Sequence, residues 1–244
     1  MNRFISSFIL TTLAGLSTII GYFIIFIKSD KNKIITFSLA FSASVMFTIS
    51  IIDLIPSSFI YLSAYNFFFK ILIIIFFVLV GIVLSNYISS KVDNNSNNLK
   101  KIGIVSLIAI ILHNIPEGII TFMVSGVNLS MGIELAIGIG MHNIPEGISI
   151  AVPLYYSTNN KIKTFLIVFI AGLSEIFGAI ICFIFLKNII NNFIIGISFS
   201  LISGIMLNIS LNELLPESMS YHNKKLLYSG FILGSIVMII SHII

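Results

Sequence analysis

Apolar residues fill this chain in eight long runs, and charged residues or asparagines separate each run from the next. A membrane-spanning helix needs roughly 20 mainly apolar residues, because at about 1.5 Å per residue it must cross about 30 Å of hydrocarbon. Each run is long enough to do so. The pattern therefore predicts an all-α, polytopic membrane protein with helices at about 4–27, 34–56, 68–88, 102–126, 130–154, 164–186, 190–215 and 226–243.

The composition agrees with one transmembrane domain over residues 1–244. Hydrophobic residues make up 57% of the chain and charged residues 9%, whereas a soluble globular protein carries about 25% charged residues. The first apolar run is longer than the core of a signal peptide and lacks a small-residue cleavage site before the following lysines, so we expect a retained helix. The single cysteine, Cys182, excludes a disulfide framework and a thiolate metal cluster.

The positive charges predict how the chain is oriented in the membrane, because loops rich in lysine and arginine stay in the cytoplasm. With eight helices, ten lysines fall on one side and Arg3, Lys70 and Lys187 on the other. Both termini are therefore expected to be extracellular or periplasmic, in a protein of the cytoplasmic (inner) membrane. Residues 89–101, with the stretch DNNSNN at 93–98, become a cytoplasmic linker. The net charge of +4 reflects this topology and does not support nucleic-acid binding.

Two internal repeats indicate an inverted architecture. The heptapeptide HNIPEGI occurs at 113–119 and again at 142–148, in consecutive helices that cross the membrane in opposite directions. A weaker match relates MFTISIIDLIP at 46–56 to MLNISLNELLP at 206–216. Together they predict a 3+2+3 inverted-repeat bundle, and inverted repeats in a polytopic protein are typical of transporters whose site lies at the repeat interface.

Each HNIPEGI segment places three ligand types on one helix face. At 100° per residue, the histidine, the glutamate four positions on and the asparagine one position on project at about 0°, 40° and 100°. Two such helices facing each other could hold two cations bridged by the glutamates. The histidines would lie on one side of the carboxylates and the asparagines on the other. The residues are His113, Asn114, Glu117, His142, Asn143 and Glu146.

The depth of these residues supports convergence. His113 and His142 each lie about 12 residues, or roughly 18 Å, inside their helices, and Glu175 in the stretch AGLSEIFG lies at a similar depth in the next helix. An unpaired carboxylate there costs several kcal/mol, so it needs a cation, a proton or a cationic side chain. Imidazole, carboxylate and amide ligands suit Zn(II), Fe(II), Mn(II), Co(II) or Cd(II) and suit Cu(I) poorly.

Other carboxylates lie nearer the expected helix ends. Asp53 falls near the outer end of the second helix, and Glu213 and Glu217 fall near the inner end of the seventh. These three residues are candidates for the mouths of an ion pathway, and carboxylates exposed at the membrane interface are an equal alternative. His222 and His242 are expected to be interfacial residues without a role.

These motifs resemble the ZIP (Zrt-, Irt-like) divalent-metal transporters, most of all their bacterial ZupT-type zinc-uptake branch. The resemblance covers nearly the whole chain and is most specific at the two HNIPEG motifs and at GLSE in the sixth helix. It implies metal uptake into the cytoplasm by alternating access. It also implies one ion position formed by His113, Glu117, His142 and Glu146, and a second formed by Asn114, Glu117, Asn143, Glu146 and Glu175.

Two features depart from the family. Asp53 stands in the second helix where a glutamate is common, and the loop between the third and fourth helices lacks the histidine-rich stretch of many eukaryotic members. Zinc sensing through that loop is therefore not expected. The sequence leaves open whether the protein is a homodimer in the lipid bilayer.

Two other function classes are alternatives to metal uptake. An intramembrane metallohydrolase also needs His and Glu one turn apart, but the zinc-protease pattern H-E-x-x-H is absent, so no enzyme is expected. A proton-coupled carrier of organic solutes would place carboxylates at the midplane but would not need two His-Asn-x-x-Glu clusters. Uptake that depends on metal would distinguish the lead hypothesis from both alternatives.

Overall fold

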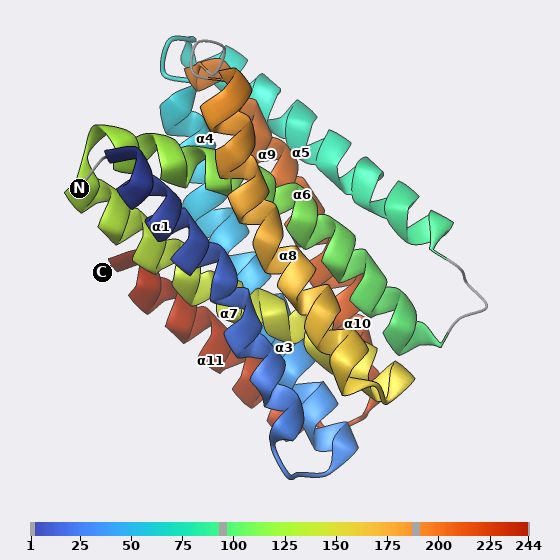
Figure 1. The fold of residues 1–244 in the computed structure, drawn as a ribbon. Helices are drawn as coiled ribbons and strands as arrows, with labels where there is room; N and C mark the ends of the chain where they lie inside the picture. The colour runs from blue at the N-terminus through green and yellow to red at the C-terminus, as the bar shows by residue number, and fades with distance from the viewer. Residues whose placement is uncertain (1–2, 93–96, 187–190, 244) are drawn as a thin grey trace.

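The computed structural model describes residues 3–92, 97–186 and 191–243, and in these ranges the chain is helical and contains no strand (Figure 1). Eight helical spans in them are long and apolar enough to cross a membrane, which confirms the predicted all-α, eight-helix fold. Asp93–Ser96 of the predicted linker and Lys187 lie outside the described residues. The spans are Arg3–Phe26, Lys31–Tyr61, Phe67–Lys91, Asn98–Val127, Leu129–Thr158, Lys161–Phe185, Asn192–Ser220 and Lys224–His242.

Several spans consist of more than one helical segment. The first contains α1 (Arg3–Leu16), α2 (Thr18–Tyr22) and a 3₁₀ turn (Phe23–Phe26). The second contains α3 (Lys31–Ile49), a π-helical turn (Ser50–Leu54) and α4 (Ile55–Tyr61), and the seventh contains α9 (Asn192–Ile209), a π-helical turn (Ser210–Leu214) and α10 (Leu215–Ser220). The others are α5 (Phe67–Lys91), α6 (Asn98–Val127), α7 (Leu129–Thr158), α8 (Lys161–Ile181) with a π-helical turn (Cys182–Leu186), and α11 (Lys224–Ile243).

Polar caps, rather than the loss of hydrophobicity, set where two of these helices begin. The carboxylate of Asp30 accepts the backbone N–H groups of Asn32 at 3.0 Å and Lys33 at 3.1 Å, so α3 begins at Lys31. The side chain of Asn97 accepts the N–H of Leu99 at 3.1 Å at the start of α6. Such caps satisfy N–H groups that have no partner inside the helix. The described part of the predicted linker 89–101 thus includes the last turn of α5 and the first turn of α6.

The weaker sequence repeat corresponds to a repeated structural feature. The π-helical turns Ser50–Leu54 and Ser210–Leu214 occupy equivalent places in the repeat, and after one intervening residue each is followed by a proline, Pro56 or Pro216. Because proline has no N–H to donate, the preceding turn loses a regular helix bond, which favours a wider turn. The second span continues beyond its turn to Tyr61, so Asp53 lies farther inside the span than the sequence placed it.

The spans form two groups of four. In the first group, α1 and α2 pack with α6, α7 and α8; in the second, α3 and α4 pack with α5, α9, α10 and α11. The largest contact between the groups joins α3 to α7. Glycines permit close approach within each group: a Cβ on Gly15 would lie 2.5 Å from the carbonyl oxygen of Gly172, and a Cβ on Gly81 would collide with the carbonyl of Leu201.

The beginning of α1 and the end of α11 lie at the same end of the bundle (Figure 1). This placement agrees with an even number of crossings. The assignment of that end to the outside of the cell stays a prediction from the distribution of lysines.

Candidate metal centre

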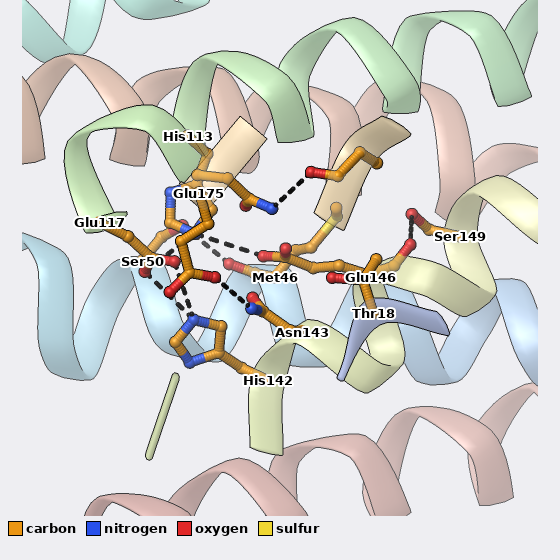
Figure 2. A network of polar contacts seen from close by, with 12 residues as sticks. Thr18, Met46, Ser50, His113, Glu117, His142, Asn143, Glu146, Ser149 and Glu175 are labelled. Carbon is orange, nitrogen blue, oxygen red and sulfur yellow. Dashed lines mark hydrogen bonds and ion pairs between the residues drawn. The ribbon is translucent and has the colours of Figure 1, made fainter. Parts of the chain in front are cut away.

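The two HNIPEGI segments lie in the middle of α6 and α7, which run as continuous helices through Pro116 and Pro145. All six predicted ligands on these helices are buried, with exposed fractions of 4% or less, and Glu175 on α8 is 0% exposed. The predicted side chains converge from the three helices (Figure 2). The residues are His113, Asn114, Glu117, His142, Asn143, Glu146 and Glu175.

Four of these residues, His113, Glu117, His142 and Glu146, form one compact cluster. The Nε2 atoms of His113 and His142 each lie 3.1 Å from Oε1 of Glu117, and Nε2 of His113 lies 3.3 Å from Oε1 of Glu146. One ligand atom from each of His113, His142 and Glu146 falls within 4.8 Å of the other two. Nitrogen and oxygen ligands lie about 2.0–2.2 Å from a zinc ion and therefore roughly 3.4 Å from one another in a tetrahedral site. The cluster thus has the dimensions of a single divalent ion site.

The amide nitrogens of the two asparagines donate to groups outside this cluster. Nδ2 of Asn114 donates to the carbonyl of Ala171 at 3.1 Å, and Nδ2 of Asn143 donates to the carbonyl of Ala14 at 3.0 Å and to Oε2 of Glu175 at 2.9 Å. Because a carbonyl only accepts, these contacts fix which end of each amide faces it. The Oδ1 atom of each asparagine therefore faces away from the carbonyl to which its Nδ2 donates.

Several oxygens of the centre are buried without a hydrogen-bond partner. They include Oδ1 of Asn114, Oδ1 of Asn143, Oε1 of Glu175 and Oε2 of Glu146. Buried polar atoms almost always have a partner, so a cluster of such atoms requires an explanation. Amide and carboxylate oxygens are ligands for divalent cations, and these are the residues predicted for a second ion position beside the first.

Sequence analysis missed the contribution of the first span, which offers no ionisable ligand but supplies the Ala14 carbonyl that orients Asn143. A third repeat could have revealed it. AGLSTIIG at 14–21 and AGLSEIFG at 171–178 share six of eight residues, and only the second stretch was singled out. The Ala171 carbonyl, which orients Asn114, occupies the corresponding place in the sixth span.

A cavity of about 450 Å³ reaches the cluster, and its lining includes residues of the first turns of α7 and of the last turn of α11. The last turn of α11 lies at the end of the bundle where α1 begins (Figure 1). Glu117 and His142 line it from the metal cluster, and Asp53, Glu134 and His242 also line it. Asp53 lines this cavity, and its carboxylate accepts a hydrogen bond from Ser57 at 3.0 Å, while its role as a pathway mouth stays a prediction. His242, for which no role was expected, lines the same cavity. Acidic side chains in a confined space concentrate cations.

The other two candidate mouths lie toward the opposite end of the bundle. Glu213 accepts a hydrogen bond from Ser89 at 2.5 Å, and Glu217 accepts one from Asn98. Burial, followed by the nearby Glu217 carboxylate, raises the pKa of Tyr221 to about 12. The Asn98–Glu217 contact joins the two helix groups. A role for Glu213 and Glu217 in an ion pathway stays a prediction.

Fold and site together define a class: polytopic helical membrane proteins with a buried His–Glu cluster that fits a metal ion. The sequence profile of the family described as ZIP Zinc transporter matches residues 88–242. The chain belongs to this family, whose members are transporters and not enzymes.

Individual relatives are similar over nearly their full length. A protein named Zinc transporter ZupT from Clostridium perfringens is 38% identical, over 99% of this chain and 96% of the relative. Proteins of the same name from Streptococcus mutans and Chlorobium chlorochromatii are 39% and 35% identical, over 97% and 98% of this chain and 96% and 97% of the relatives.

Proposed function

We propose that this protein carries Zn(II) across the membrane into the cytoplasm, with the ion bound at the His–Glu cluster on α6 and α7. The observation that carries the proposal is the meeting of both histidines at one oxygen of Glu117, at 3.1 Å each, where the cavity reaches the cluster. Two neutral imidazoles and two carboxylates would supply four ligands and balance one divalent charge. The names of the relatives support zinc as the transported ion.

The same donor set extends the proposal to other metals. Imidazole and carboxylate ligands also bind Fe(II), Mn(II), Co(II) and Cd(II), and affinity for such sites depends more on geometry than on exclusive ligand chemistry. We therefore expect competition among these ions for the same cluster.

We further propose a second ion position beside the first, formed by Asn114, Asn143 and Glu175 with the bridging Glu117 and Glu146. The unpartnered oxygens of the asparagines, Glu146 and Glu175 support it. Two divalent ions would bring four positive charges, and the three glutamates would bring three negative ones. That balance makes two ions tolerable in a low-dielectric site, where an uncompensated charge is costly.

Alternating access would require the two helix groups to move relative to each other. All seven candidate ligands lie in the first group, so they would move together. Away from the cavity, polar contacts join the groups: Ser42 donates to the carbonyl of Pro145 at 2.7 Å, Lys31 donates to that of Tyr156 at 3.4 Å, and Asn98 donates to Glu217. These hydrogen bonds would have to break before the metal ion could be released on the cytoplasmic side.

Uptake of zinc into liposomes that contain the purified protein tests the proposal. The reconstituted wild type should accumulate Zn(II) faster than empty liposomes, and Cd(II) or Mn(II) in excess should slow that uptake. A matched protein with both Glu117 and Glu146 replaced by Gln keeps the side-chain size but loses the bridging charges, and it should be inactive. Equal zinc uptake by the wild type and this double variant would reject the cluster as the transport site.

A further inference from the structure

Thr18 occupies in the first span the place that Glu175 occupies in the sixth. The repeat aligns Ala14, Gly15 and Ser17 with Ala171, Gly172 and Ser174, and in the next position threonine replaces glutamate. Thr18 is 0% exposed, as is Glu175, and both residues are drawn in Figure 2. The two positions are therefore equivalent in the sequence repeat.

Hydrogen bonds on the two sides of the centre are equivalent. The carbonyl of Ala14 accepts from Asn143 on α7 and from Ser17, at 3.0 and 2.6 Å. The carbonyl of Ala171 accepts from Asn114 on α6 and from Ser174, at 3.1 and 2.5 Å. Each asparagine of the centre is therefore oriented by the same backbone group of the repeat, one from the first span and one from the sixth.

The glycine contacts obey the same relationship. Gly118 on α6 packs against the backbone carbonyl of Glu175, and Gly147 on α7 packs against that of Thr18. A Cβ on Gly15 would lie 3.0 Å from Cβ of Glu175, and a Cβ on Gly172 would lie 3.6 Å from Cβ of Thr18. These four contacts form two matched pairs, in which Glu175 and Thr18 exchange places. A pseudo-twofold axis that passes between Gly15 and Gly172 therefore relates the two residues.

The two halves differ in charge. Glu175 places a carboxylate oxygen 2.9 Å from Nδ2 of Asn143. The hydroxyl of Thr18 instead donates to the carbonyl of Gly15 at 2.8 Å, so Asn114 receives no equivalent carboxylate. The centre therefore has three carboxylates where a fully symmetric one would have four.

We propose that Thr18 is a specificity-determining position of the centre and the counterpart of Glu175. Because the side chain of Thr18 is neutral, the third carboxylate of the centre is confined to one half. This inference rests on the proposed metal-transport function. According to this proposal, a divalent cation is held more tightly in the half of the centre that contains Glu175. Moving the carboxylate to position 18 should make the other half the tighter site. A carboxylate contributes both a ligand and a charge in a site of low dielectric constant.

The first experiment relocates the carboxylate and measures Zn(II) binding to the purified protein by calorimetry. E175T should weaken binding of one ion by about 10- to 100-fold, the range seen when a group that supports a metal site is lost. The double variant T18E/E175T should recover most of that affinity. Its matched control, T18Q/E175T, has the same side-chain size without the charge and should not recover it.

Each result bears on a different claim. No zinc binding by the wild type would reject the proposed function itself. Wild-type binding that E175T does not weaken, or that T18E/E175T restores no better than T18Q/E175T, would overturn the role of position 18 and leave the transport function standing.

A second experiment avoids a large buried side chain. Cysteine is close to threonine in size, and T18C with Cd(II) bound should give the ultraviolet charge-transfer band of a cadmium–thiolate bond. The cadmium-loaded wild type, whose Cys182 is buried, gives the background absorbance that is subtracted. T11C is the matched control, because Thr11 is also 0% exposed and its hydroxyl, like that of Thr18, donates to a backbone carbonyl of the first span, here that of Ser7 at 2.9 Å. The absence of the band in cadmium-loaded T18C, or an equal band in T11C, would overturn the proposal.

Discussion

Nε2 of His142 lies 3.1 Å from Oε1 of Glu117, although the two residues belong to different helices and to different copies of the repeat. The same oxygen lies 3.1 Å from Nε2 of His113. Glu117 is also part of the cavity wall, whereas Glu146 is not among the residues that line it. Glu117 is therefore the carboxylate that an ion arriving through the cavity would meet together with His142.

Replacement of Glu117 by Ala should reduce zinc uptake by on the order of 100-fold or more, because it removes a shared ligand and one negative charge from a buried site. Glu146→Ala should do nearly the same. The control is Glu134→Ala, which removes a carboxylate from the same cavity away from the cluster and should keep most of the activity. Initial rates in proteoliposomes give the comparison, and a correctly inserted Glu117→Ala protein with the wild-type rate would contradict it.

Loss of an asparagine should be milder than loss of a glutamate, since an amide is a neutral ligand. The two asparagines should nonetheless differ. Asn143→Ala also removes the hydrogen bond to Glu175, whereas among the described residues Asn114 donates only to the Ala171 carbonyl. We expect the apparent affinity for zinc in uptake assays to fall more in Asn143→Ala than in Asn114→Ala. The reverse order would show that the Asn143–Glu175 contact does not support the site.

Much of this arrangement could be predicted from the sequence. Apolar runs predict the eight spans, because the length of a membrane helix is fixed by the bilayer. Helical spacing predicts that His113 and Glu117 share a face, and the structure places them 3.1 Å apart. The repeat of MFTISIIDLIP indicated equivalent places in the second and seventh spans, where the π-helical turns Ser50–Leu54 and Ser210–Leu214 occur.

Other features depend on contacts that periodicity does not encode. The role of the first span lies in backbone carbonyls and close glycine packing, so no charged or metal-binding side chain marks it. The extension of the second span to Tyr61 depends on a π-helical turn before Pro56, where a sequence-based boundary ends the helix. The cavity that joins Asp53 to His142 arises from the packing of several helices and could not be read from any one of them.

Glu175→Gln should lower the number of bound metal ions without abolishing transport. Glutamine keeps an oxygen ligand but removes one of the three negative charges, so the four remaining first-position ligands can still neutralise one divalent ion. Anomalous diffraction at the zinc edge should show two peaks in the wild type and one in the variant. One unchanged peak in both proteins would exclude the second position.

Zinc affinity should fall as the pH drops from about 7 to about 5.5, because a histidine must be neutral to bind a metal and free imidazole titrates near 6.5. Binding should release protons, and the release should grow toward lower pH. Calorimetry in two buffers with different ionisation enthalpies measures this directly and avoids any effect of a proton gradient on transport. An affinity that stays constant over this range would count against His113 and His142 as ligands.

Gly118→Ala should destabilise the protein and weaken zinc binding together. A Cβ at this position would collide with the backbone carbonyl of Glu175, and neighbouring backbone yields less readily than the end of a flexible side chain. Relief of the collision requires α6 and α8 to move apart, at a cost of about 1–3 kcal/mol. Because α8 carries Glu175, the same movement withdraws its carboxylate from Asn143.

Gly138→Ala provides the matched control for this effect. Gly138 lies in α7, and no atom lies within 4 Å of the place where its Cβ would be. Alanine favours a helix over glycine by about 1 kcal/mol, so this variant should melt at or slightly above the wild-type temperature and bind zinc normally. Thermal unfolding with and without zinc separates the two variants: Gly118→Ala should melt several degrees lower and gain less from added zinc. Equal melting temperatures for the two would refute the importance of the contact between α6 and α8.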